Sequence, residues 1–392
     1  MIFNEWTYAA FLALALVGFS LLPQRARAAW LMTVGALFYA FYGGLWLVVF
    51  IAEIVISRFY EPKSRVSLWG IAQAVAILAL VKYGPFLVAV ASDISVRLGG
   101  STLGPVAQIP LPLGLSFFVF EFVHYAADRY FGRAEKQRLV DYGAFILFFP
   151  TMIAGPIKRI QGFAPSLANA RVNGADLWFG LQRIAIGLCK KAILADNLSN
   201  LIEGGFTPNV PHEARYATLV FRIVVYSFRI YFDFSAYSDI AIGSARLFGI
   251  HVPENFNWPY LAKTPSEFWR RWHISLSRWI TDYLFIPFGG SRGTRARTIV
   301  ATLAAMTLSG LWHGAAWNFV IWGAYHAVLL VAYRGARPIW QRVAPLTVRE
   351  SRPMQLAYIA GNFALVTYGW IFFAMPIGTA LPYALRLAGI SR

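Results

Sequence analysis

The chain is poor in charge and in cysteine, and each shortage excludes a class of protein. Only 14% of its 392 residues are charged, whereas soluble domains average about 25%. Because 58% of the residues are hydrophobic, an ordinary soluble domain is excluded and a polytopic membrane protein is indicated. Cys189 is the single cysteine, so no disulfide can form within the chain.

Sequence signatures of several common binding sites are also missing. The chain has no phosphate-binding loop and no dinucleotide-binding glycine motif. His124 and Asp128 are four residues apart, but two ligands do not make a metal site and a hydrogen bond between them suffices. We therefore expect no metal cofactor. Internal repeats, linkers and low-complexity tracts are absent as well, which predicts one membrane-embedded domain over residues 1–392.

Basic residues, in contrast, are in excess, and the formal net charge is +17. In a soluble protein this excess would suggest a nucleic-acid partner. Here the lysines and arginines separate apolar segments, so we expect no nucleic acid and attribute most of the charge to the positive-inside rule. Some of these side chains could also contact the phosphates of a cofactor.

Apolar segments make up most of the chain. A span needs about 20 apolar residues, and the aromatic content of 17% suits interfacial belts. Basic residues follow the first segment rather than precede it, so we expect a retained first span and no cleaved signal peptide. Gly43 and Gly44 predict a tight hairpin between two short segments. The candidate spans are 6–22, 28–42, 45–58, 67–91, 107–127, 140–155, 177–200, 216–248, 298–312, 314–333 and 356–375.

Three stretches break this pattern. Residues 148–160 carry two prolines and a glycine in an apolar setting. Such backbone breaks are tolerated at membrane depth where they line a cavity or pack within protein. Residues 251–267 and 285–297 are too polar to span, and we expect them to cap the cytoplasmic face or to enter it as re-entrant loops.

Two histidines lie in aromatic and apolar settings. His313 follows Trp312 in a segment apolar enough for the bilayer, where an ionisable side chain is a functional candidate by default. His273 belongs to an earlier stretch rich in tryptophan, where a continuous helix would place it beside Ser277 and Ile280. Histidine exchanges protons near neutral pH, so the pair suggests proton transfer inside a membrane. Packing alone explains His273 equally well.

Small residues surround the later histidine. Gly310 and Gly314 bracket Trp312 and His313 at four-residue spacing. This spacing permits a close contact between helices. The missing side chains would equally let a bulky substrate approach the imidazole, and the two interpretations are compatible.

Other polar residues accompany the histidines. In the segment 221–249, an ion pair between Arg229 and Asp233 would account for both charges, but Tyr237 and Asp239 add more polarity than pairing requires. Two consecutive arginines before His273 would lie at headgroup level or contact cofactor phosphates. The candidate substrate-binding residues are Asp233, Tyr237, Trp312, Arg270 and Arg271.

Several of these residues belong to strings with a family pattern. The chain resembles the membrane-bound O-acyltransferase (MBOAT) family, and within it the bacterial alginate O-acetyltransferase branch. The resemblance covers roughly residues 1–335 and is most specific over 231–314. It rests on the strings Pro112–Phe118, Ala154–Ile157, Tyr231–Asp239, Pro253–Tyr260, Glu267–Ser277, Tyr283–Gly290 and Leu311–Gly314.

The resemblance implies a fold, a site and a reaction. The fold would be an all-α polytopic bundle of roughly 10–11 spans, with re-entrant or amphipathic helices, around a central tunnel. His313 would be the catalytic histidine and His273 the second active-site histidine, within a catalytic portion at about 221–333. The enzyme would carry acetyl from cytoplasmic acetyl-CoA across the bacterial inner membrane. Its acceptor would be an extracytoplasmic polysaccharide hydroxyl or a periplasmic acetyltransferase-like partner in the cell envelope.

Two other functions match parts of the sequence. A D-alanyl exporter would take its acyl group from the thioester of a carrier protein and pass it to a cell-surface acceptor. The loop 286–292 favours the acetyl branch over this alternative. A transporter or flippase would use the charged residues of 222–239 as a substrate path, but it leaves the two histidine strings unexplained. In each case the lipid bilayer is an expected partner.

The chemistry of acyl transfer is consistent with these residues. A thioester releases a thiol with a pKa near 8.5, so it reacts readily, and the difficult step is the activation of a hydroxyl. A positioned histidine base accelerates that step by roughly 10²–10⁴-fold. His313 would take the hydroxyl proton. His273 or Tyr237 would orient the acceptor or donate to the developing oxyanion.

Overall fold

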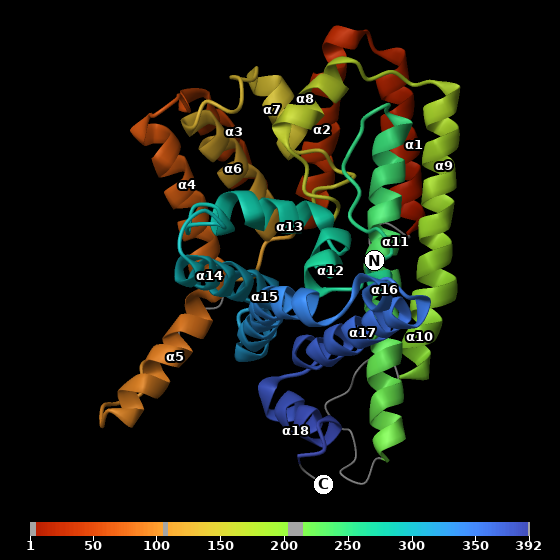
Figure 1. Cartoon of the computed structure of the whole chain (residues 1–392). Helices are drawn as coiled ribbons and strands as arrows, with labels where there is room; N and C mark the ends of the chain where they lie inside the picture. The colour runs from red at the N-terminus through yellow and green to blue at the C-terminus, as the bar shows by residue number, and fades with distance from the viewer. Residues whose placement is uncertain (1–4, 105–108, 203–214, 391–392) are drawn as a thin grey trace. The chain divides into compact units, whose positions relative to one another are not determined.

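The computed structural model describes residues 5–104, 109–202 and 215–390, and all regular structure in these ranges is helical (Figure 1). The expected all-α fold is thereby confirmed. The chain forms two compact units, Met1–Leu188 with Tyr237–Pro253, and Cys189–Ala236 with Glu254–Arg392. The expectation of a single domain stays a prediction. The expected span 107–127 begins at two positions outside the described residues.

The first unit contains the N-terminal helices. Gly44, with φ of +62°, makes the hairpin between the second and third helices that the paired glycines predict. A π-helical turn at Ala79–Tyr83 joins two further helices into one run over Arg65–Arg97. The helices are α1 Trp6–Leu21, α2 Gln24–Gly43, α3 Trp46–Ile56, α4 Arg65–Leu78, α5 Gly84–Arg97, α6 Leu115–Tyr130, α7 Leu139–Ile146, α8 Ile160–Ala168 and α9 Gly174–Cys189, whose last residue belongs to the second unit.

The expected span 140–155 is only partly helical. α7 ends at Ile146, and the chain then passes through turns until α8 begins. Pro150 and Pro156 lack the backbone N–H that a continuing helix would need. Although irregular, the stretch is packed inside the unit. Lys158 is buried and donates to the buried carboxylate of Glu121, so this polar pair is internally satisfied.

The second unit contains the remaining helices, and local signals fix where several of them begin. Thr264 caps one helix by accepting from the backbone N–H of Glu267 at 3.1 Å, and Thr294 caps another by accepting from that of Arg297 at 3.3 Å. The helices are α10 Asp196–Leu201, α11 Tyr216–Leu247, α12 Pro265–Arg271, α13 Ile274–Ile280, α14 Arg295–His313, α15 Trp317–Val343, α16 Leu346–Arg349, α17 Arg352–Ala374 and α18 Ile377–Leu387. The end of α11, from Tyr237, belongs to the first unit.

Among the described residues, three helical runs are long and apolar enough to cross a membrane: Arg65–Arg97, Trp317–Val343 and Arg352–Ala374. α1 is apolar but has only 16 residues. α11 has 32 residues, and charged side chains recur along it. The sequence therefore contains more apolar segments than the described structure has helices with the length and composition of a span. Charged residues and helix breaks interrupt the remaining segments.

An aromatic core occupies the second unit and surrounds the site. Trp322 on α15 and Trp370 on α17 are each 1% exposed, and their rings stack at 5.8 Å. Phe268 and Trp272 from the α12 region belong to the same cluster. α14 and α15 approach closely where Gly310 faces Gly323, since a Cβ on Gly310 would lie 2.9 Å from the Gly323 Cα. This contact fixes the end of α14, where His313 lies.

Candidate active site

His273 lies at a break between two short helices rather than within one helix. α12 ends at Arg271, α13 begins at Ile274, and His273 has φ of +42° in the left-handed region. Ser277 and Ile280 follow His273 in α13, as the helical spacing predicts, but the helix does not continue before His273. The reason is competition for the backbone, because the carbonyl of Asn255 accepts from the Ile274 N–H at 2.9 Å. A non-glycine residue held in this conformation is strained, and such strain clusters at functional sites.

Asn255 also holds the His273 ring. Its side-chain oxygen lies 3.2 Å from Nδ1 of His273 and accepts from the Ser275 hydroxyl at 2.6 Å. All three residues are buried. Because an amide oxygen only accepts, the contact requires a proton on Nδ1 and leaves Nε2 as the acceptor nitrogen in the neutral ring.

The environment of His273 keeps its imidazole neutral. The residue is 1% exposed, and Phe234 packs edge-on against it at 4.7 Å between ring centroids. Burial lowers the pKa of His273 to about 3. Nε2 has no hydrogen-bond partner among the described residues. A neutral ring with a free lone pair can accept from a substrate hydroxyl, which favours the orienting role over donation to an oxyanion.

His313 lies at the C-terminal end of α14, where the helix stops at an extended Gly314. Its ring is partly exposed and packs against Trp322 at 5.2 Å and Phe373 at 5.0 Å between centroids. A Cβ on Gly314 would lie 2.1 Å from the Phe319 ring. The two glycines around His313 thus serve close packing, and His313 retains access to the surroundings that a proton-transferring group needs.

Trp312 connects the two histidines. Its ring lies 4.6 Å from His313 and 6.3 Å from His273 between centroids. The structure therefore brings His273 from one sequence string close to the adjacent Trp312 and His313 of another. The Trp312 indole therefore lies beside both imidazoles.

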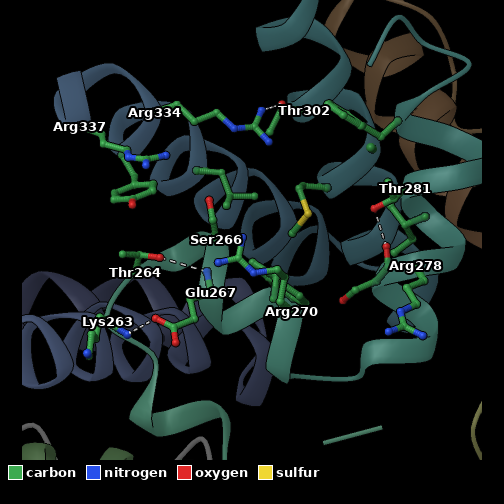
Figure 2. A pocket seen from close by; sticks show the side chains of 18 of the residues that line it. Lys263, Thr264, Ser266, Glu267, Arg270, Arg278, Thr281, Thr302, Arg334 and Arg337 are labelled. Carbon is green, nitrogen blue, oxygen red and sulfur yellow. Dashed lines mark hydrogen bonds between the residues drawn. The ribbon is translucent and has the colours of Figure 1, made fainter. Parts of the chain in front are cut away.

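A large basic cavity lies in the same unit (Figure 2). Its volume is about 1140 Å³, and α12, α13, α14, α15 and α17 contribute to its wall. Arg334 donates to the Thr302 hydroxyl at 2.9 Å, and Figure 2 shows basic side chains from several helices around the space. The lining contains five basic residues, Lys263, Arg270, Arg278, Arg334 and Arg337, against the two acidic residues Glu267 and Asp282.

The wall of this cavity includes residues next to both histidines. Ile274 directly follows His273 in the chain. Ser309 precedes His313 by one helical turn on α14, so the two side chains share a face. These two wall residues connect the cavity to the two histidine strings, while its wall includes neither imidazole.

The other candidate residues divide between the cavity and separate ion pairs. Arg270 lines the cavity, whereas Arg271 pairs with Glu267 at 2.7 Å. Asp233 accepts from Lys191 at 2.8 Å, and Arg229 donates to a serine instead of to Asp233. Tyr237 is buried in the first unit, so the structure does not place it relative to the histidines. Roles for Asp233, Tyr237 and Arg271 stay predictions.

Two residues of the site were missed by reasoning from the sequence. Asn255 belongs to one of the family strings, and an amide near a candidate histidine was the available signal. His326 gives no signal in the sequence, because it belongs to no ligand cluster, yet it is fully buried beside Trp322. Within the described ranges, no group of three His, Cys, Asp or Glu side chains could hold a metal ion.

An all-helical fold with helices long and apolar enough to cross a membrane, and with two histidines and a basic cavity in one unit, is consistent with a membrane-embedded group-transfer enzyme. The sequence model of the membrane-bound O-acyltransferase family matches residues 106–375. The chain belongs to this family and is an O-acyltransferase.

Relatives with named activities align with most of this chain or with about half of it. The probable alginate O-acetylase AlgI of Azotobacter vinelandii is 36% identical over 93% of this chain and 72% of its own length. The peptidoglycan O-acetyltransferase of Helicobacter pylori is 30% identical over 97% of this chain and 78% of its own. The teichoic acid D-alanyltransferase of Bacillus subtilis is 34% identical, but over 56% of this chain and 58% of its own.

Proposed function

We propose that the protein transfers acetyl from cytoplasmic acetyl-CoA, across the bacterial inner membrane, to a hydroxyl of a cell-envelope polysaccharide or to a periplasmic acetyl-transfer partner. The observation that carries the proposal is the basic cavity, whose wall includes the chain neighbour of His273 and a residue one helical turn from His313. A tunnel that continues from it to the far side is part of the proposal. It would allow the donor to react without crossing the membrane.

The cavity suits the donor in charge and size. Coenzyme A carries several phosphates, and arginine binds phosphate through paired, charge-assisted hydrogen bonds. Arg270, Arg334 and Arg337 are available for this role. The volume of about 1140 Å³ exceeds the range of roughly 300–1,000 Å³ for common small-molecule sites, as an extended nucleotide thioester requires. Basic segments also favour the cytoplasmic side, where this donor is found.

The histidine pair supplies the proton transfers. His313 takes the proton of the acceptor hydroxyl while the oxygen attacks the thioester carbonyl. His273, held by Asn255 with its Nε2 lone pair available, accepts from a second hydroxyl of the acceptor and so orients it, because the reacting hydroxyl gives its one proton to His313. The C–O bond forms, the C–S bond breaks, and the thiolate receives the proton that left the hydroxyl. Atoms and charge therefore balance without a further reactant.

The acetyl group is favoured over D-alanine by the extent of similarity. Relatives named as O-acetylases or O-acetyltransferases align over nine-tenths of the chain, and the D-alanyltransferase over 56%. D-alanyl transfer from a carrier protein remains the second candidate, because that relative is 34% identical where it aligns. In that case the cavity would receive the phosphopantetheine arm of an acidic carrier.

Turnover in nanodiscs tests the proposal directly. The purified protein would be given acetyl-CoA or a D-alanylated carrier protein, with an oligosaccharide acceptor, and free thiol would be measured. We expect thiol release and acceptor acetylation with acetyl-CoA alone. Strict dependence on the carrier protein would overturn the acetyl proposal in favour of alanylation.

Histidine variants assign that turnover to the site. We expect His313→Ala to abolish transfer and His273→Ala to reduce it less, because an orienting group typically contributes less than the base. His251→Ala is the matched control, since His251 is exposed and lies in the other unit. Near wild-type transfer by a well-folded His313→Ala protein would remove His313 from the mechanism.

A further inference from the structure

His326 is a buried histidine whose ring nitrogens make no hydrogen bond to the part of the chain that the structure describes. It is 0% exposed, and neither Nδ1 nor Nε2 has a hydrogen-bond partner among the described residues. An unpaired buried polar atom costs about 1–3 kcal/mol, and buried polar side chains are rarely left without a partner. A ring that only filled space could be phenylalanine without this cost. The histidine therefore requires an explanation.

The ring of His326 is enclosed by aromatic side chains. Trp322 and Trp269 pack edge-on at 5.0 and 5.1 Å between centroids, and Phe268 stacks parallel at 6.3 Å. Tyr325 also touches it, but its hydroxyl donates to the Leu365 carbonyl. On α17, Gly369 leaves room for the ring, since a Cβ there would lie 3.0 Å from Nε2. Tyr325 is the titratable group among these neighbours, and none of them is charged.

Other unpaired polar atoms extend from this ring in two directions. Trp322 Nε1 has no partner, and the Trp322 ring also packs against His313 at 5.2 Å. Trp269 Nε1 and the Ser309 hydroxyl have no partner either, and both residues line the basic cavity. These unpaired polar atoms therefore lie on side chains that connect Trp322, the neighbour of His313, through His326 to the wall of the cavity.

We propose that these atoms hold a short chain of buried water molecules and that His326 relays a proton along it between His313 and the basic cavity. Buried waters typically bridge such otherwise unsatisfied groups. An imidazole can accept a proton at one nitrogen and release it from the other. The inference rests on the proposed acyl transfer.

The relay would complete the proton balance of the reaction. His313 takes the proton of the acceptor hydroxyl, and the leaving thiolate lies on the cavity side. The proton passes from the His313 imidazolium through water to one His326 nitrogen, while the other nitrogen releases a proton towards the cavity. The thiolate becomes a thiol, and both histidines return to their neutral forms. His326 acts through His313 and is a positioning and relay residue.

Two substitutions separate this relay from simple packing. His326→Gln keeps a polar side chain that cannot be protonated, and His326→Phe keeps an aromatic ring. We expect both to lower kcat by about tenfold or more, within the effect of general acid–base groups, and to leave the KM for the thioester unchanged. Val328→Ala, at an exposed residue of the same helix, is the control. A kcat within twofold of wild type in a folded His326→Phe protein would overturn the relay.

Chemical rescue gives a readout that packing would not produce. In His326→Ala, imidazoles of increasing pKa and similar size would be added to the nanodisc assay. Rescue that follows the pKa of the added base supports a relay, whereas rescue that follows size alone contradicts it. The donor would be whichever thioester the wild-type protein uses, so an error about acetyl-CoA would not affect this result.

The relay can also be tested in the wild-type protein, where no substitution disturbs folding. The rate in mixtures of H₂O and D₂O should curve with deuterium fraction, because more than one proton moves in the relay. A linear dependence, with the absence of a pre-steady-state burst showing that transfer chemistry limits the rate, would contradict the relay. Absence of turnover with every thioester would instead refute the proposed function.

Discussion

The side-chain oxygen of Asn255 lies 3.2 Å from Nδ1 of His273, and both residues are almost fully buried. The same oxygen accepts from Ser275, so one amide fixes the ring, its tautomer and the start of α13. A residue eighteen positions earlier in the chain thereby determines which nitrogen of His273 faces the substrate. Partners that orient a functional histidine often matter nearly as much as the histidine itself.

Asn255→Ala tests this relationship. Removing the amide leaves Nδ1 of His273 and the Ser275 hydroxyl without their acceptor, so we expect transfer to fall by about 10–100-fold, the range for lost partners of a functional histidine. Asn255→Asp keeps an acceptor oxygen and should retain more activity with an altered pH profile. Asn257→Ala, at an exposed asparagine nearby, is the control. Equal activity of the two alanine variants would contradict the orienting role.

The lowered pKa of His273 predicts a dependence of stability on pH. Burial lowers this pKa from 6.5 to about 3. Below about pH 6.5 the unfolded chain therefore binds a proton that the folded protein excludes. Stability that is present above pH 6.5 is lost as the pH falls towards 3.

Thermal unfolding of His273→Gln checks this sign. The Tm of the variant should fall less than that of wild type between pH 7 and pH 5, while titrating carboxylates affect both proteins alike. His251→Gln, at an exposed histidine, should follow wild type. Parallel curves for wild type and His273→Gln would contradict a neutral buried imidazole.

The sequence predicted the chemistry of the residues around His273 better than their backbone conformation. Hydrophobicity located most helices, because long apolar runs such as α15 and α17 leave few alternatives. The break at His273 could not be predicted, because it depends on a backbone contact with Asn255 that periodicity does not reveal. The same holds for His326, whose significance comes from neighbours on α12 and α17. The sequence left an ion pair between Arg229 and Asp233 open, and local spacing could not show that Asp233 pairs with a lysine on a different segment.

The close contact of α14 with α15 predicts that alanine destabilises the protein at a glycine within the contact but not at a glycine outside it. A Cβ on Gly310 would lie 2.2 Å from the Phe319 carbonyl oxygen, so Gly310→Ala must push the helices apart. We expect a loss of about 1–3 kcal/mol, as for other overpacked sites, together with weaker transfer, because His313 lies on the same helix.

Gly335→Ala provides the matched control. Gly335 lies within α15, and nothing would touch a Cβ there within 4 Å. Alanine favours a helix over glycine by about 1 kcal/mol, so this variant should be as stable as wild type or slightly more stable. Thermal unfolding in detergent measures both effects. A Gly310→Ala protein as stable as Gly335→Ala would show that the helices can separate without cost.

Charge reversal in the basic cavity tests where the donor binds. Arg337 lines the cavity on α15, and a glutamate there would repel the phosphates of the thioester. We expect Arg337→Glu to raise the KM for the donor about tenfold, equivalent to about 1.4 kcal/mol. The kcat at saturating donor should change little, because the residue does not adjoin the histidines in the chain.

Arg342→Glu makes the same charge change without altering the cavity wall. Arg342 is exposed in the last turn of α15 and does not line the cavity. Since both variants change the net charge equally, a general effect on donor attraction would raise the KM in both. Higher salt should also weaken donor binding by wild type more than by Arg337→Glu, because screening acts on the attraction that the variant has lost. Equal KM values for the donor in wild type and Arg337→Glu, at both low and high salt, would place the donor phosphates elsewhere.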